Sequence, residues 1–184
     1  MRLEPIEKPR GLMLRIAYWA SRRRLGKVMT PMKVVYARMP AILKVSYDLT
    51  MFTEKKIRLE PGLRLLVMAM AGSINRCTFC VDIAEAMAVE NHLGLDKFHA
   101  LVEYRTSPLF SDRERAALAY AEEATRNKRV MDATFEELRK HFQEWEIVEI
   151  TWLNALENYY NLINLPLGIE SDGLCAIARK RAAA

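Results

Sequence analysis

The segment LRLLVMAMAGSINRCTFCVDIAEAMAV, residues 63–89, decides the fold of this chain. Its first half places apolar residues on every face of a helix, and a helix that is apolar all round is a buried one. Its second half is an alanine-rich amphipathic helix with Cys80, Ile83, Ala84 and Met87 on one stripe. The sequence therefore predicts two helices, the first at the centre of the core, joined by a corner that holds two cysteines.

The rest of the chain also shows helical periodicity and no lasting alternation of the kind that strands produce. Ser111 and Glu114 have the spacing of a capping box, and Thr134 and Glu137 repeat it. Helices are expected at about 12–24, 40–52, 62–74, 80–94, 95–104, 111–126, 134–142 and 145–163, with another from 173. We therefore expect an all-α fold, a single multi-helix domain over residues 1–184.

Apolar spacing also suggests which faces turn inward. In the first helix, Leu12, Ile16 and Trp19 recur at helical spacing. In the last long helix, the predicted inner residues are Val148, Trp152, Ala155, Tyr159 and Ile163. The polar stripe of Asn154, Asn158 and Asn161 on the same helix is expected to be solvated, or to form hydrogen bonds at a subunit interface.

Charge and composition limit the class of protein. The 184 residues carry a net charge of +5, concentrated in a basic N-terminal arm of about residues 1–30. A solvated helix end is the favoured explanation of this arm; peripheral membrane contact is the alternative, and no nucleic-acid partner is expected. No signal peptide is evident, and the longest apolar run, 65–71, is too short to span a bilayer. We expect a cytoplasmic protein.

The cysteines give the only clear sign of chemistry. Cys77 and Cys80 form a C-x-x-C motif, in which one thiolate can attack an oxidant and the other can resolve the intermediate. Asn75 is the expected N-cap, which would place Cys77 in the first helical turn, and Arg76 adds a positive charge. The alternative is two inert core thiols. Cys175 is expected to have no role.

Other sites that use cysteine fit less well. A zinc site would need a second ligand pair, and the three histidines, His92, His99 and His141, are scattered. A thioredoxin fold would need a strand before the motif, where the sequence predicts a helix. No metal and no cofactor are therefore expected.

The all-apolar helix, the Asn75-x-Cys77-x-x-Cys80 corner and the alanine-rich helix together resemble the carboxymuconolactone decarboxylase family, whose members include the alkylhydroperoxidase D-like proteins. The similarity is clearest over residues 61–94 and extends more weakly over 40–170. It implies an all-α domain that assembles as a homo-oligomer, a trimer or hexamer. It also implies a thiol site that reduces a hydroperoxide substrate and is regenerated by a thiol or protein reductant.

The chain departs from the peroxidase members of that family at two positions. Those members carry a Glu twelve residues before the first cysteine and a His four residues after the second, and here these positions are Leu65 and Ala84. Only Cys77 and Cys80 carry over as catalytic residues. Asp82, Glu85, His92 and His99 are the remaining candidates for a proton acceptor.

The sequence thus predicts a thiol-dependent oxidoreductase with peroxiredoxin-like activity. One alternative is a non-catalytic oligomer of the same fold that is redox-responsive or purely structural. A lyase of the carboxymuconolactone decarboxylase type ranks lower, because the sequence shows no acid or base beside a carboxylate clamp.

Overall fold

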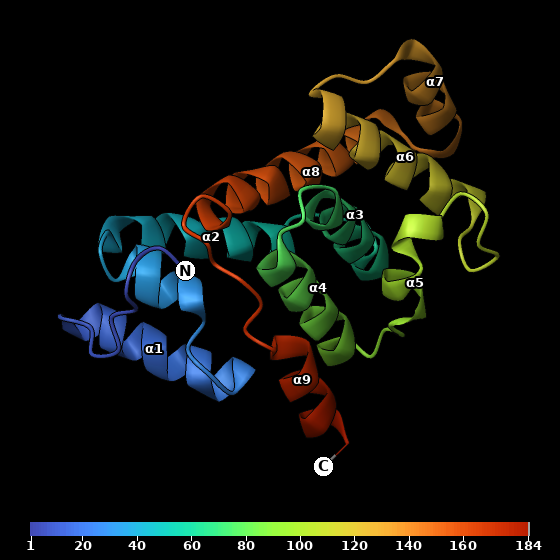
Figure 1. Cartoon of the computed structure of the whole chain (residues 1–184). Helices are drawn as coiled ribbons and strands as arrows, with labels where there is room; N and C mark the ends of the chain where they lie inside the picture. The colour runs from blue at the N-terminus through green and yellow to red at the C-terminus, as the bar shows by residue number, and fades with distance from the viewer. Residues whose placement is uncertain (184) are drawn as a thin grey trace.

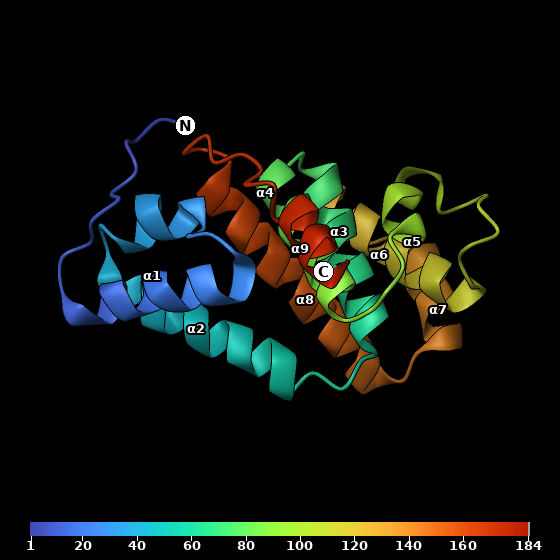
Figure 2. The ribbon, with the colours of Figure 1, turned by 90° about the horizontal axis from the view of Figure 1, so that it is seen from below.

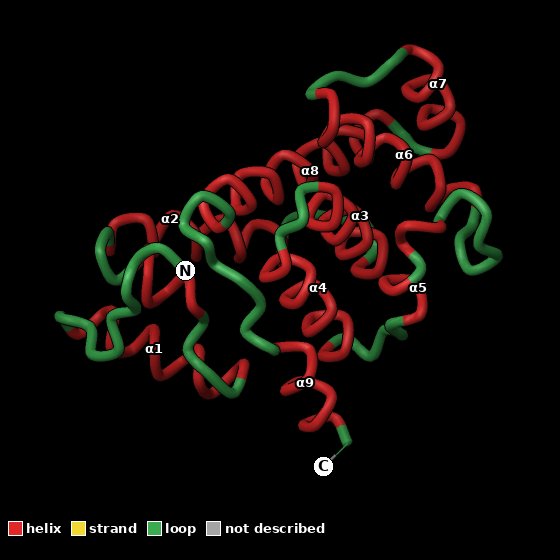
Figure 3. Tube along the Cα trace, in the orientation of Figure 1, coloured by secondary structure: helices red, strands yellow, loops and turns green. Residues whose placement is uncertain are grey.

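The computed structural model describes residues 1–183, and these form the expected all-α fold. The tube in Figure 3 shows helices and loops and no strand in this part of the chain. The α-helices are α1 (Leu12–Leu25), α2 (Pro40–Lys55), α3 (Pro61–Ile74), α4 (Thr78–Glu90), α5 (Asp96–His99), α6 (Asp112–Asn127), α7 (Asp132–His141), α8 (Glu144–Asn164) and α9 (Leu174–Ala182). A π-helical turn, η1 (Met32–Tyr36), and a 3₁₀ turn, η2 (Leu101–Glu103), complete the set.

Helix α3 is the centre of the fold, as its sequence predicted. It packs against α4, α6 and α8, and Leu66, Val67 and Ala71 on its different faces are all fully buried. Figures 1 and 2 show α1 and α2 at one end of the molecule and α5, α6 and α7 at the other. The two ends are therefore held together through α3, α4 and α8.

The buried apolar side chains form a larger core and smaller ones. The larger core joins α3 to α6 and α8, with Leu118 and Leu153 among its fully buried members. A smaller core surrounds the cysteine pair: Val34 of η1, Ile169 of the loop after α8 and Leu174 of α9 pack there with Cys77 and Cys80. The cysteines thus lie where the N-terminal third, α4 and the C-terminal segment meet.

Two helices bury a different face from the one that apolar spacing suggested. Helix α1 leaves Leu12, Ile16 and Trp19 exposed, and buries Leu14 and Tyr18 instead. Tyr18 packs against Val28, Met32 and Tyr36, and its hydroxyl donates a hydrogen bond to the Ile6 carbonyl oxygen at 2.7 Å. This contact with residues before and after α1 decides which side of the helix faces inward.

Helix α8 departs from its prediction in the same way. Val148, Trp152 and Tyr159, all expected inside, are exposed. The buried face carries apolar residues in its first half and polar residues toward its end, Asn154, Glu157, Asn161 and Asn164. The reason lies in the polar contacts that these side chains make with α3, α4 and α6.

A side-chain cap explains the start of α6, whereas most other helices of residues 1–183 begin without one. Ser111 and Glu114 form the predicted capping box at the start of α6. Helix α7 instead begins at Asp132, two residues before Thr134, so the second predicted box is wrong. An acidic residue in the first turn suits the helix dipole without a capping hydroxyl. The predicted helix over 95–104 is two short turns, α5 and η2.

The N-terminal arm is attached to the rest of the fold. The Arg2 amide donates to the Leu167 carbonyl oxygen at 2.9 Å, and the Ile6 amide donates to the Lys33 carbonyl oxygen at 3.1 Å. Within residues 1–183, no helix is both long enough and apolar enough to span a bilayer.

Candidate active site at the α3–α4 corner

The chain turns sharply between α3 and α4. Asn75 ends α3, Arg76 adopts a left-handed backbone conformation with φ 57°, and the Cys77 amide donates to the Gly72 carbonyl oxygen at 2.8 Å. Cys77 is itself the N-cap of α4, because the Cys80 amide donates to its carbonyl oxygen at 3.0 Å. The prediction that Asn75 caps α4 is therefore wrong, and it is Cys80 that lies in the first turn.

The structure joins the two cysteines of the motif in a disulfide. Their Cα atoms are 5.2 Å apart, and both side chains are buried within the small core. The bond links the residue before α4 to the first turn of that helix. The spacing of the C-x-x-C motif thus brings the sulfurs together as a dithiol/disulfide pair requires.

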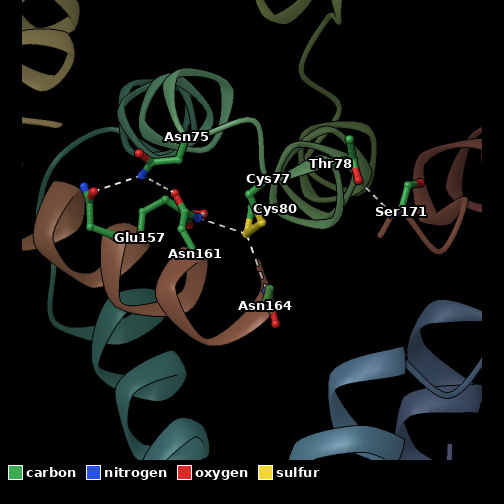
Figure 4. The surroundings of a disulfide bond; sticks show 9 residues. Asn75, Cys77, Thr78, Cys80, Glu157, Asn161, Asn164 and Ser171 are labelled. Carbon is green, nitrogen blue, oxygen red and sulfur yellow. Dashed lines mark hydrogen bonds between the residues drawn. A yellow bond between two sulfur atoms is a disulfide. The ribbon is translucent and has the colours of Figure 1, made fainter. Parts of the chain in front are cut away.

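Amide groups from α8 reach the sulfur of Cys80. The Nδ2 of Asn161 donates to Cys80 Sγ at 3.0 Å, and the Nδ2 of Asn164 does so at 3.5 Å. Figure 4 shows both side chains extending from α8 toward Cys80, whereas Thr78 faces Ser171 on another side of α4. Hydrogen bonds of this kind stabilise a thiolate more than a thiol. Cys80 is therefore the better stabilised of the two sulfurs as an anion.

Asn161 is held in place by the helix corner. Its Oδ1 accepts a hydrogen bond of 2.7 Å from Asn75 Nδ2, and the same nitrogen donates to Asn158 Oδ1 at 2.9 Å. With its oxygen occupied in this way, Asn161 presents its NH₂ group to Cys80. The side chain of Asn75 thus orients the donor instead of capping the helix.

Glu157 is the residue that sequence reasoning missed. It is 4% exposed, and its Oε1 accepts a hydrogen bond of 2.6 Å from Asn161 Nδ2, the same nitrogen that donates to Cys80. Burial raises the pKa of the Glu157 carboxyl to about 7, partly offset by the Asn161 hydrogen bond. Glu157, Asn161 and Asn164 share one helix face by their spacing, and this was the available signal.

The asparagine stripe of α8 makes its hydrogen bonds inside the chain. Asn154 Oδ1 accepts from Thr125 Oγ1 of α6 at 2.8 Å, and Asn158 Nδ2 donates to the same hydroxyl at 3.2 Å. Asn154 and Asn161 are buried. The expectation of a solvated stripe or a subunit contact is therefore wrong.

Asp82 has a structural role. Its side chain is buried and accepts hydrogen bonds from the Ser171 hydroxyl and from the amides of Asp172, Leu174 and Cys175, at 2.8 to 3.0 Å. It thereby satisfies the free amides at the start of α9, the groups that most need an acceptor there. Asp82 is not available to accept the proton of a thiol.

The other candidate proton acceptors form no hydrogen bond with either sulfur within residues 1–183. Glu85 is two turns farther along α4 than Cys77, and His99 approaches it with its Nε2 3.9 Å from the carboxylate. His92 is an exposed residue after the end of α4. Leu65 and Ala84 are both members of the large apolar core. Glu85 does border the same cavity as Cys77.

A shallow cavity of about 370 Å³ reaches the corner from outside. Its lining includes Arg76 and Cys77 from the corner, Glu85 from α4 and Ser171 from the loop before α9. The cavity therefore borders the corner that carries the disulfide, although Cys77 itself is fully buried.

Cys175, the third cysteine, has a thiol that ionises less readily than an ordinary one. Burial and the nearby carboxylate of Glu85 raise the pKa of its thiol to about 11. It is the only free cysteine, and no group of three or more His, Cys, Asp or Glu within residues 1–183 is arranged to hold a metal ion. Cys175 therefore provides an internal reference for the reactivity of the pair.

Several known proteins resemble this chain. The family model of the carboxymuconolactone decarboxylase family matches residues 36–123. The uncharacterized protein YnjA of Escherichia coli K12 is 38% identical over 186 residues, covering 98% of this chain and 100% of YnjA. YdfG of Bacillus subtilis, also uncharacterized, is 25% identical over 72% of this chain and 91% of its own length.

Solved structures share the fold of this chain. A protein of unknown function from Agrobacterium tumefaciens, described provisionally as the antioxidant defence protein AhpD, is 28% identical with a TM-score of 0.69, covering 75% of this chain and 96% of its own. The debrominase Bmp8, solved as a cysteine-to-alanine variant in complex with 2,3,4-tribromopyrrole, shares the fold with a TM-score of 0.82 at 17% identity over 99% and 97% of the two chains. The matched family model, the full-length relative and the AhpD-like fold together show that the chain belongs to the carboxymuconolactone decarboxylase family, among its AhpD-like members.

Proposed function

We propose that this protein is a dithiol/disulfide oxidoreductase that reduces hydroperoxides through Cys77 and Cys80. The observation that carries the proposal is the disulfide itself, with two amide donors directed at one of its sulfurs. An inert pair of core thiols would need no such donors. The likeness to a protein assigned provisionally to antioxidant defence points the same way.

The reaction balances as follows. The Cys80 thiolate attacks the terminal oxygen of the hydroperoxide, the O–O bond breaks, and the alkoxide leaves and takes up a proton as an alcohol. The resulting sulfenic acid is attacked by the Cys77 sulfur, which forms the disulfide and releases water. A dithiol reductant then restores both thiols by exchange and is itself oxidised to a disulfide. We place this cycle in the cytoplasm, where such reductants are maintained.

We assign different roles to the two cysteines: Cys80 attacks the hydroperoxide, and Cys77 is the sulfur that the reductant attacks. Cys80 has the hydrogen bonds that favour a thiolate, and it also lies in the first turn of α4, where the helix dipole helps. Cys77 borders the cavity but is fully buried, so in this proposal a reductant reaches it when the corner opens locally. Attack at Cys77 releases Cys80 as the leaving thiolate, which is the sulfur that the amides stabilise.

The test is turnover with an excess of reductant. Cumene hydroperoxide and dithiothreitol are mixed with the protein, and peroxide consumed per chain is followed with time. Many equivalents should be consumed, and Cys77→Ser or Cys80→Ser should end turnover. The matched control, Cys175→Ser, should turn over normally.

Two results would overturn this proposal. Consumption of a single equivalent, with the Cys77–Cys80 disulfide formed and not recycled, would show a redox-responsive protein that is not a catalyst. Thiols that peroxide leaves intact, found by mass spectrometry after alkylation, would show that the pair is part of the core only.

A further inference from the structure

We propose that Glu157 is the proton-exchange group of the cysteine pair, taking the proton of the Cys80 thiol and returning it to the leaving oxygen. This inference rests on the proposed function. It assigns a catalytic residue on α8, at a position far in the sequence from the cysteine motif.

The first argument is geometric. A single nitrogen, Asn161 Nδ2, lies 2.6 Å from Glu157 Oε1 and 3.0 Å from Cys80 Sγ. The carboxyl oxygen and the sulfur are therefore both within hydrogen-bonding distance of the same group. In this proposal the proton passes between these two atoms, which lie on the same Asn161 nitrogen.

The backbone of α3 leaves space for this approach. A Cβ atom at Gly72 would lie 3.3 Å from Cys80 Cβ and 3.6 Å from Glu157 Oε1. Gly72 thus lies between the cysteine and the carboxyl group, and its missing side chain lets α4 and α8 come close. Cys80 of α4 and Glu157 of α8 thus both lie next to Gly72.

The second argument concerns charge. Glu157 is almost completely surrounded by protein, and among the ion pairs of the described residues none includes it. A buried carboxylate without a cation is unfavourable, so the group readily holds a proton. It also loses that proton near neutral pH, since burial raises its pKa to about 7. A proton-transfer group works best when its pKa is close to the working pH.

On the α8 side of the cysteine pair, the titrating neighbours of Glu157 are tyrosines. From α8, Tyr160 interacts electrostatically with Glu157, and Tyr36 of η1 lies near Tyr160. Burial raises the pKa of both tyrosine hydroxyls above the ordinary value, so they stay neutral. From α3 and α4 the neighbours are Gly72 and Cys80. Glu157 is therefore the carboxyl that shares a hydrogen-bond donor with Cys80, whereas Asp82 and Glu85 border the cavity beside Cys77.

The proton balance closes. In the reduced protein the Glu157 carboxylate takes the Cys80 proton, which leaves a thiolate and a neutral carboxyl. The carboxyl protonates the alkoxide as the O–O bond breaks. The regenerated carboxylate then accepts the Cys77 proton and passes it to the hydroxide that leaves the sulfenic acid, so that water departs and the disulfide forms.

The experiment compares Glu157→Gln with the wild-type protein. Glutamine keeps the shape and can still accept the Asn161 hydrogen bond, but it cannot take a proton. Peroxide turnover should fall by roughly 100-fold or more, the range usual for loss of a positioned acid or base. The pH at which Cys80 is alkylated, followed by mass spectrometry from pH 5 to 10, should fall, because glutamine places no negative charge beside the thiolate. Glu157→Asp should restore part of both.

The matched control is Glu149→Gln. Glu149 is also on α8, but its carboxylate accepts hydrogen bonds from the Arg58 and Leu59 amides and does not approach the cysteines. It should leave turnover and the Cys80 profile unchanged. Circular dichroism of each variant checks that it is folded.

The outcomes separate this inference from the proposed function. If Glu157→Gln turns over peroxide at the wild-type rate with an unchanged Cys80 profile, Glu157 is a structural residue and the oxidoreductase proposal stands. If the wild-type protein itself does not turn over peroxide, the proposed function fails first. A fall in turnover without a change in the Cys80 profile would also contradict proton exchange at that sulfur.

Discussion

Helices α3 and α8 lie side by side and both meet the cysteine pair, yet they bury opposite kinds of side chain. Helix α3 is apolar on every face and buries leucine, valine and alanine. The end of α8 turns its amides and a carboxyl inward and leaves Trp152 and Leu162 in solvent. Helix α3 thus supports the fold, and α8 carries the polar groups that our proposal uses, because buried polar groups destabilise a core unless they are paired.

The largest expected effect is on stability, from truncations on the two helices. Leu66→Ala on α3 removes a fully buried side chain and should lower the free energy of unfolding by about 2–5 kcal/mol. Leu162→Ala on α8, 71% exposed, should change it by less than about 0.5 kcal/mol. Urea denaturation at two protein concentrations measures both. A large loss for Leu162→Ala would show that a second copy of the chain covers this face in solution.

The next effect concerns pH. The pKa of Glu157 is raised in the folded state to about 7, so its contribution to stability is fully present below about pH 4.5 and is lost as the pH rises through about 7. Relative to Glu157→Gln, the wild-type free energy of unfolding should fall by about 3 kcal/mol over this range. Denaturation of both oxidised proteins from pH 4 to 8 tests this. Parallel curves would mean that Glu157 is hydrated and titrates normally.

A smaller effect is expected on the pH at which Cys80 is alkylated, and it should differ between substitutions of two buried asparagines of α8. Asn161→Ala removes a donor to the Cys80 thiolate, and such hydrogen bonds contribute roughly 1.5–3 kcal/mol. The pH at which Cys80 becomes alkylated should rise by about one unit or more. Asn154→Ala, whose partner is Thr125, should leave that pH unchanged. Equal shifts in the two variants would point to general loosening of α8 in place of a specific contact.

The sequence predicted the elements of the fold well. The apolar run of α3, the capping box at Ser111 and the C-x-x-C pair all depend on local patterns, and the structure retains each of them. The faces of α1 and α8 were wrong because both helices have apolar residues on two sides. What selects the buried side is tertiary: the Tyr18 hydroxyl in α1, and the hydrogen bonds of Asn161 in α8.

The site was only half predictable for a related reason. Cys77 and Cys80 are close in sequence, so their spacing alone brought them to notice. Glu157 is 77 positions beyond Cys80, and in a single sequence it looks like a surface residue of an amphipathic helix. Only the packing of α8 over the α3–α4 corner makes it part of the same site.

Gly72 sets a limit on how this protein can be engineered. Within a helix, alanine is favoured over glycine by roughly 1 kcal/mol, so a thermostabilisation program would choose this position early. The new methyl group would meet Cys80 Cβ at 3.3 Å and Glu157 Oε1 at 3.6 Å. Cys80 would have to move by a few tenths of an ångström to make room, and a screen based on melting temperature alone would not report that shift.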